Sequence, residues 1–143
     1  MRSPFPAWAK VAIIVARIIL AAVFAMAMAF KFAGMHATAA FIAAAGIPAA
    51  LPLAWIAAFF ELALVLCFLT GAFFREAALA AAAYVVFLGI VFHGPSHWHA
   101  DQNQFGFFVD HFVFLAGLLF AAVCGPGDVL AMSRARLIES GPE

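Results

Sequence analysis

Polar side chains stand inside the long apolar runs of the sequence, among them Arg17, Glu61 and Tyr84. A charged side chain at the centre of a membrane-spanning helix costs about 2.5–3.5 kcal/mol, so such residues usually pair and face the protein interior. Counted along ideal helices, Arg17 and Glu61 lie at depths that differ by about 6 Å, which an arginine side chain can bridge. We expect the three residues to form one intramembrane polar network. Its role is either to lock two helices together, or to move protons or bind a head group.

Histidines are the second group of chemically versatile side chains. The sequence contains five of them, His36, His93, His97, His99 and His111. Together with Asp101, the residues His93, His97 and His99 supply ligand types suited to Zn, Cu or Fe, although their spacing matches no recognised metal signature. These four residues are therefore candidates for a metal site on the outer side of the membrane.

Two alternatives to a metal site use the same region. His93, Asp110, His111 and Trp98 could line an outer-side pocket for a quinone or another ring-shaped ligand. The histidines could also be interfacial residues that bond to head groups and water. The sequence carries no phosphate-binding loop, nucleophile elbow, dinucleotide fingerprint or haem attachment motif that would decide between them. Whether the chain is an enzyme, and which cofactor it holds, therefore stay open.

The composition determines the surroundings in which these residues must work. Of 143 residues, 69% are apolar and 10% are charged, with seven acidic and seven basic side chains. An ordinary soluble domain has about 45–50% apolar and about 25% charged residues, and a domain this small could not cover its surface with so few polar side chains. The composition excludes a soluble globular enzyme, a disordered chain and a nucleic-acid binder with a basic face. It indicates a protein that lies in the lipid bilayer.

Four apolar stretches are long enough to position the polar side chains on membrane-spanning helices, because a hydrocarbon core of about 30 Å needs roughly 20 apolar residues per helix. The expected spans cover about 11–30, 51–70, 77–93 and 105–124. Continuous apolar runs argue against a membrane barrel, whose strands alternate apolar and polar residues. We predict an all-α membrane protein, a four-helix transmembrane bundle that forms one domain over residues 1–128. A cytoplasmic tail over 129–143 follows it.

Basic residues predict the orientation of the bundle. Five of the seven flank the spans on one face, and they are Arg2, Lys10, Arg75, Arg134 and Arg136. By the positive-inside rule we expect both termini in the cytoplasm and the protein in the cell (inner) membrane. On the opposite face, the alanine-rich stretch 37–45 ends in Gly46-Ile47-Pro48, a helix-stop signal. It predicts a short interfacial helix in the first outer loop.

Taken together, these features resemble the DoxX family. The resemblance covers roughly residues 17–128 and rests on Arg17, Lys31, Gly46-Ile47-Pro48, Glu61, Gly71, Gln104 and Gly125-Pro126-Gly127. It implies a four-helix membrane bundle, and some members of the family are implicated in thiosulfate:quinone oxidoreduction and in membrane-anchored oxidative-stress complexes. The chain departs from the family pattern at Asp128-Val129-Leu130, where the family has an aromatic-Ser-Leu-Asp ending.

Two functions fit these expectations. The resemblance implies a membrane subunit of a redox-linked assembly, associated with quinone or thiol chemistry. The alternative is a non-catalytic accessory subunit that packs on a larger membrane complex. Both need the lipid bilayer and other membrane or membrane-associated subunits as partners, and neither involves nucleic acid. A transporter ranks behind both, because the sequence lacks the interrupted helices that bind substrate in many transporters.

Overall fold

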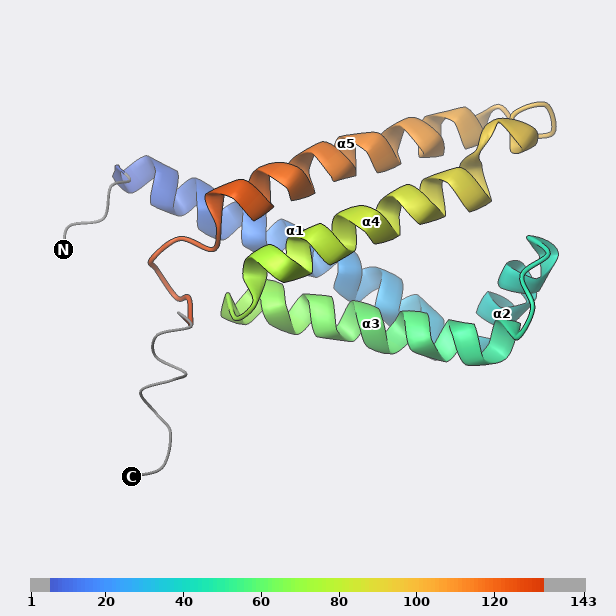
Figure 1. Ribbon diagram of the computed structural model, residues 1–143, viewed down its shortest axis with the longest axis horizontal. Coiled ribbons are helices and arrows are strands. Elements are labelled where there is room, and N and C mark those ends of the chain that lie inside the picture. The colour runs from blue at the N-terminus through green and yellow to red at the C-terminus, as the bar shows by residue number, and fades with distance from the viewer. Residues whose placement is uncertain (1–5, 133–143) are drawn as a thin grey trace, which may run out of the picture. The chain divides into compact units, whose positions relative to one another are not determined.

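The computed structural model describes residues 6–132, which are mainly helical (Figure 1). Four helices are long and apolar enough to cross a membrane, and no strand occurs within the described range. The prediction of an all-α protein with four spans is confirmed. Arg2, Arg134 and Arg136, used to predict the orientation, lie outside the described residues, as does most of the predicted tail.

The chain divides into two compact units. The first combines the residues up to Phe74 with those from Gly125 onward, and the second is Arg75–Cys124. The first unit is therefore built from both ends of the sequence, and the second is inserted between its two parts. We call the described part that follows the insertion, residues 125–132, the C-terminal segment.

The first unit contains the helices α1 (Ala7–Ala33), α2 (Met35–Ala44) and α3 (Ala50–Thr70). α1 and α3 lie side by side and run antiparallel, and α2 packs against α3 (Figure 1). α2 confirms the short helix predicted over 37–45, while its interfacial position stays a prediction. The helix ends just before Gly46, whose φ of 77° lies in the left-handed region that favours glycine.

Small side chains line the buried faces of the first unit. Ala21 on α1 is 2% exposed, and Ala54 and Ala58 on α3 are completely buried. Phe24 of α1 stacks on Phe68 of α3 with the ring centroids 5.8 Å apart. Membrane helices associate through such small residues, because lipid tails are as apolar as the side chains and close packing must hold the helices together.

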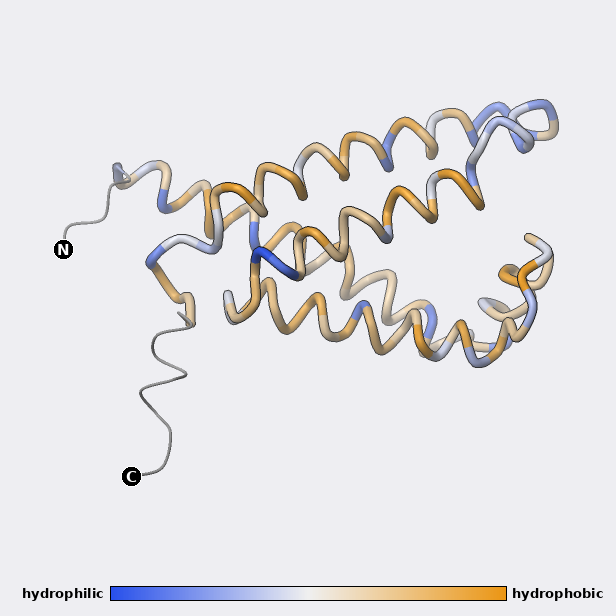
Figure 2. Tube along the Cα trace, in the orientation of Figure 1, coloured by the Kyte–Doolittle hydropathy of each residue, from blue (hydrophilic) through white to orange (hydrophobic). Residues whose placement is uncertain are grey.

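The outward faces of the helices are apolar, and apolar residues run along every span (Figure 2). Large exposed side chains occur on all four, among them Trp8, Phe30, Ile56, Leu79 and Phe120. In a bilayer the lipid tails cover such a surface, while the helical hydrogen bonds satisfy the backbone. The chain is a small multi-pass membrane protein.

The second unit is a hairpin of α4 (Phe74–His93) and α5 (Asn103–Cys124), joined by a loop that contains the short helix η1 (Pro95–His97). The two long helices run antiparallel (Figure 1). At the end away from the loop, Arg75 Nη1 donates to the carbonyl of Ala122 at 3.1 Å. This bond joins the first turn of α4 to the last turn of α5.

Candidate functional site

Arg17 is buried in the middle of α1, with 4% of its surface exposed. Its guanidinium has five N–H donors, and five backbone carbonyls accept from it. Nε donates to Phe68 at 3.1 Å, Nη1 to Pro126 at 3.2 Å and Val129 at 3.0 Å, and Nη2 to Leu69 at 2.7 Å and Leu130 at 2.9 Å. The acceptors belong to the end of α3 and to the C-terminal segment. Every donor of Arg17 is therefore used in holding the backbone.

These bonds complete the C-terminal end of α3. The last four carbonyls of a helix have no partner within the helix. Here Gly71 N donates to Cys67 O at 2.8 Å, Arg17 donates to the carbonyls of Phe68 and Leu69, and Met132 N donates to Thr70 O at 2.9 Å. A cation at this position also interacts favourably with the negative end of the helix dipole. Arg17 thus caps α3 and ties the C-terminal segment to it.

The predicted contact between Arg17 and Glu61 does not form, because Lys31 pairs with Glu61 instead. The prediction assumed that Lys31 and Leu51 mark the same depth in the membrane. In the structure Lys31 lies level with Glu61, ten residues further along α3 than Leu51, which is about 15 Å on a helix. That offset places Arg17 beside the end of α3.

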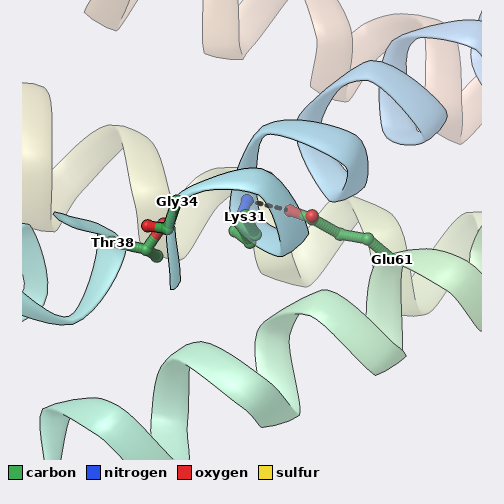
Figure 3. A network of polar contacts seen from close by, with 4 residues as sticks. All are labelled: Lys31, Gly34, Thr38 and Glu61. Carbon is green, nitrogen blue, oxygen red and sulfur yellow. Dashed lines mark hydrogen bonds and ion pairs between the residues drawn. The ribbon is translucent and has the colours of Figure 1, made fainter. Parts of the chain in front are cut away.

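Lys31 and Glu61 form a partly buried ion pair (Figure 3). Lys31 Nζ lies 2.7 Å from Glu61 Oε1, and the two side chains are 19% and 1% exposed. Close to the pair, Thr38 Oγ1 donates to the carbonyl of Gly34 at 3.2 Å, where α1 gives way to α2. Because each charge neutralises the other, the pair joins α1 to α3 without leaving an isolated charge inside the unit.

Two histidines lie together in the second unit. The ring centroids of His93, at the end of α4, and His111, on α5, are 5.0 Å apart. His93 Nδ1 lies 2.7 Å from Gln104 Oε1, and His111 Nδ1 lies 2.7 Å from the carbonyl of Phe107. Gly89 permits the close approach of α5, since a Cβ at that position would lie 3.0 Å from the Cβ of His111. The hairpin holds both half-buried rings in defined orientations.

The predicted four-residue metal site of His93, His97, His99 and Asp101 is not assembled. His97 Nε2 lies 3.2 Å from a carbonyl of α4, Asp101 accepts a backbone N–H at the start of α5 at 2.9 Å, and His99 is exposed. Across residues 6–132, no group of three or more His, Cys, Asp or Glu side chains is placed to hold a metal ion. The turn of η1 separates these side chains, because it bends a loop that the prediction treated as extended.

The predicted outer pocket is assembled only in part. Trp98 lies beside His93, to whose carbonyl its Nε1 donates at 2.9 Å. Its ring packs on Phe105 and Phe108, with centroids 5.0 Å and 5.4 Å away. Asp110, in contrast, is exposed, whereas its neighbour His111 is half-buried against α4. No bond between Asp110 and the other three pocket residues occurs in the described chain.

Asp110 occupies an unusual position for a carboxylate. It lies about a third of the way along α5, a helix apolar enough to span a membrane. Within residues 6–132 no hydrogen bond or ion pair reaches its side chain. Gly106 and Gly117 flank it on the same face, and a Cβ at either glycine would meet nothing within 4 Å. α5 thus presents a carboxylate between two small residues on an apolar surface.

The sequence interpretation did not identify the roles of Lys31 and Gln104. The sequence places Lys31 at the outer end of the first span, although a lysine directly after the predicted span 11–30 is as well placed to meet an acidic residue on the next helix. Gln104 follows Asp101 by three residues, a spacing at which side chains on a helix meet, and this spacing could have predicted their contact. Tyr84 lies half-buried on α4 in the second unit, and its part in a polar network stays a prediction.

Comparison with known protein families identifies the family of the chain. The family model DoxX matches residues 12–94, a range that includes Arg17, Lys31, Glu61 and His93. No curated protein and no solved structure matches the chain. Asp110 and His111 lie beyond the matched range, so their interpretation rests on the geometry of this chain.

Proposed function

Since the chain belongs to the DoxX family, whose model matches more than half of it, we propose that it is a subunit of a larger, redox-linked membrane assembly. Both of its termini lie in the cytoplasm, and the membrane is the inner membrane of the cell. This orientation is supported by Lys10 and Arg75, which flank the spans on the face assigned to the cytoplasm.

The observation that carries the subunit role is the exposed carboxylate of Asp110. On an isolated chain this side chain faces lipid, at a cost below the ~2.5–3.5 kcal/mol of a charged residue at a helix centre, because Asp110 lies about a third of the way along α5. The cost disappears when another helix covers the carboxylate and donates to it. Gly106 and Gly117 leave room for such a helix to approach closely, as membrane helices do at small residues.

The chemistry of Asp110 specifies the partner. The covering helix must be membrane-spanning and must carry a hydrogen-bond donor or a basic side chain at the depth of Asp110. The described cations of this chain are already engaged: Arg17 and Arg75 bind carbonyls, and Lys10 and Lys31 bind carboxylates. A second copy therefore offers no unengaged cation from the described residues, and we favour a different protein as the partner.

The redox part of the proposal is supported by the family, some of whose members are implicated in quinone-linked chemistry. The accessory alternative is favoured by Arg17, because its five donors are all bonded to backbone and none is available to a substrate. The two differ in one respect: a redox subunit contributes groups to the chemistry of the assembly, and an accessory subunit contributes only its surface.

The test is a gentle-detergent pull-down of the tagged protein from its native membrane, with every co-purifying chain identified. We expect a stoichiometric membrane protein that carries a redox cofactor. Asp110→Leu should reduce its recovery at least tenfold without lowering the thermal stability of the purified subunit, while Phe30→Leu, at another exposed position, should leave recovery unchanged. Recovery of the wild-type chain alone would contradict the proposal, and a partner without redox function would favour the accessory role.

A further inference from the structure

The side chains of His93 and His111 carry a second site, whose argument begins with their hydrogen bonds. The partner of His111 Nδ1 is the carbonyl of Phe107, which can only accept, so Nδ1 must carry the proton. A neutral imidazole with its proton on Nδ1 has a lone pair on Nε2. His111 therefore presents Nε2 as an acceptor or a metal ligand.

The same conclusion holds for His93, through a chain of two further residues. Gln104 Nε2 lies 3.4 Å from the carboxylate of Asp101, which can only accept. That contact turns the amide so that its oxygen, Oε1, faces His93 Nδ1 at 2.7 Å. The opposite amide orientation would bring Oε1 against the carboxylate, two acceptors together. His93 Nδ1 therefore donates, and its Nε2 also carries a lone pair.

This arrangement matches how proteins prepare histidine ligands. A metal-binding histidine almost always donates its other ring N–H to a carbonyl or a carboxylate, which fixes the tautomer and the ring orientation. Both His93 and His111 have such an acceptor, and one of the acceptors is itself held by Asp101. The bond from His93 to Gln104 also joins α4 to α5, whereas the bond from His111 to the carbonyl of Phe107 lies within α5 and joins no second helix.

The separation of the rings fits one metal ion. With a Zn–N bond of about 2.0 Å and a nitrogen-to-ring-centre distance of about 1.1 Å, two imidazoles on a tetrahedral ion have ring centres about 5 Å apart. The observed separation is 5.0 Å. Two imidazoles in a linear arrangement would have ring centres about 6 Å apart, so the spacing favours tetrahedral coordination.

We propose that His93 and His111 bind a tetrahedral late first-row metal ion such as Zn²⁺ through their Nε2 atoms. The remaining positions are open to water or a small external ligand, because His97 and Asp101 already bond elsewhere. Open positions are typical of metal sites that act on a ligand, whereas structural sites are closed by four protein ligands. The proposal is independent of the subunit role, since it needs only the second unit.

The experiment uses the purified full-length chain in detergent, stripped with a chelator and titrated with Zn²⁺ against a competing indicator. We expect one Zn²⁺ per chain, and at least tenfold weaker binding in His93→Gln and in His111→Gln. The matched controls, His97→Gln and His99→Gln, should stay within twofold of the wild type. Co²⁺ should give the visible absorption of a tetrahedral ion in the wild type, and this absorption should be lost in both site variants.

Thermal unfolding without metal separates binding from folding, because the site variants should then unfold at temperatures no lower than those of the control variants. Equal losses of Zn²⁺ affinity in the site variants and the control variants would assign the binding to the loop and overturn the proposal. So would the absence of Zn²⁺ binding by the folded wild-type chain, or binding unaffected by either site variant.

Discussion

The polar centre of the first unit and that of the second unit use their donors differently. The five N–H donors of Arg17 are all used, each bonding to a different backbone carbonyl. His93 and His111 each use one ring nitrogen and leave the other with a lone pair. Both centres lie within apolar helices, yet one is saturated and the other is half used.

This difference separates structure from chemistry in a membrane protein. A charge in lipid is costly whatever its purpose, so its presence alone does not identify a functional residue. What distinguishes the two centres is whether any bonding capacity remains after the protein has used what it needs. Arg17 has none, and we assign it to the fold; the histidine pair has two acceptor atoms, and we assign it to a ligand.

The largest effect should come from Arg17. Arg17→Ala leaves five carbonyls without their donor, one in a buried bond and four in part-buried bonds. At about 1–3 kcal/mol for a fully buried group and less for the others, the summed loss is a large part of the stability of an ordinary domain and should lower the amount of folded protein. The amount of folded protein in detergent measures this. Ile18→Ala, at the neighbouring exposed position, should fold normally. A folded Arg17→Ala protein would remove the contrast between the two centres.

The ion pair should rank second. Lys31→Met leaves the 1%-exposed carboxylate of Glu61 without its cation and should destabilise the chain by about 3 kcal/mol. Thermal unfolding in detergent measures the change. The double variant Lys31→Glu with Glu61→Lys should recover more than half of the loss, because it restores a pair. The double variant Arg17→Glu with Glu61→Arg should recover none of the stability lost in its single variants. Recovery would support the contact between Arg17 and Glu61 that the sequence predicted.

A smaller effect should follow from the support of His93. Gln104→Leu removes the acceptor of His93 Nδ1 and leaves the Nε2 atoms of His93 and His111 in place. Zn²⁺ affinity should therefore fall about tenfold, the lower end of the range for losing a residue that supports a metal ligand. Tenfold corresponds to about 1.4 kcal/mol. The Zn²⁺ titration described above measures it, with thermal unfolding as the control. An unchanged affinity would mean that the tautomer is not set by Gln104.

The smallest effect should belong to the pair between Lys10 Nζ and Asp128 Oδ2, 3.1 Å apart. Their side chains are 31% and 46% exposed, so solvent screens the attraction and Asp128→Asn should cost less than about 1 kcal/mol. Thermal unfolding at low and high salt measures it. A loss as large as that of Lys31→Met would show that proximity to the Arg17 centre matters more than exposure.

Sequence reasoning predicted the four spans and the short helix, because apolar length and a Gly-Ile-Pro stop depend on neighbouring residues only. It did not predict the partners of Arg17 and Glu61, because these depend on the offset between two helices. That offset is set by packing of residues such as Phe24 on Phe68, which no local pattern records. It selected His93 and His111 as site residues, but their tautomers depend on Gln104 and a carbonyl, which only the folded hairpin brings to them.

The cap on α3 links the C-terminal segment of the first unit to its first helix. The acceptors of Arg17 include the carbonyls of Pro126, Val129 and Leu130, and the carbonyl of Thr70 accepts from the N–H of Met132. During synthesis, α1 and α3 leave the ribosome long before the C-terminal segment does. The early helices therefore reside in the membrane with an incomplete joint until the C-terminal segment has also left the ribosome. A chain that stalls before that point lacks three acceptors of Arg17 and the N–H that bonds to Thr70, so the end of α3 stays only partly capped.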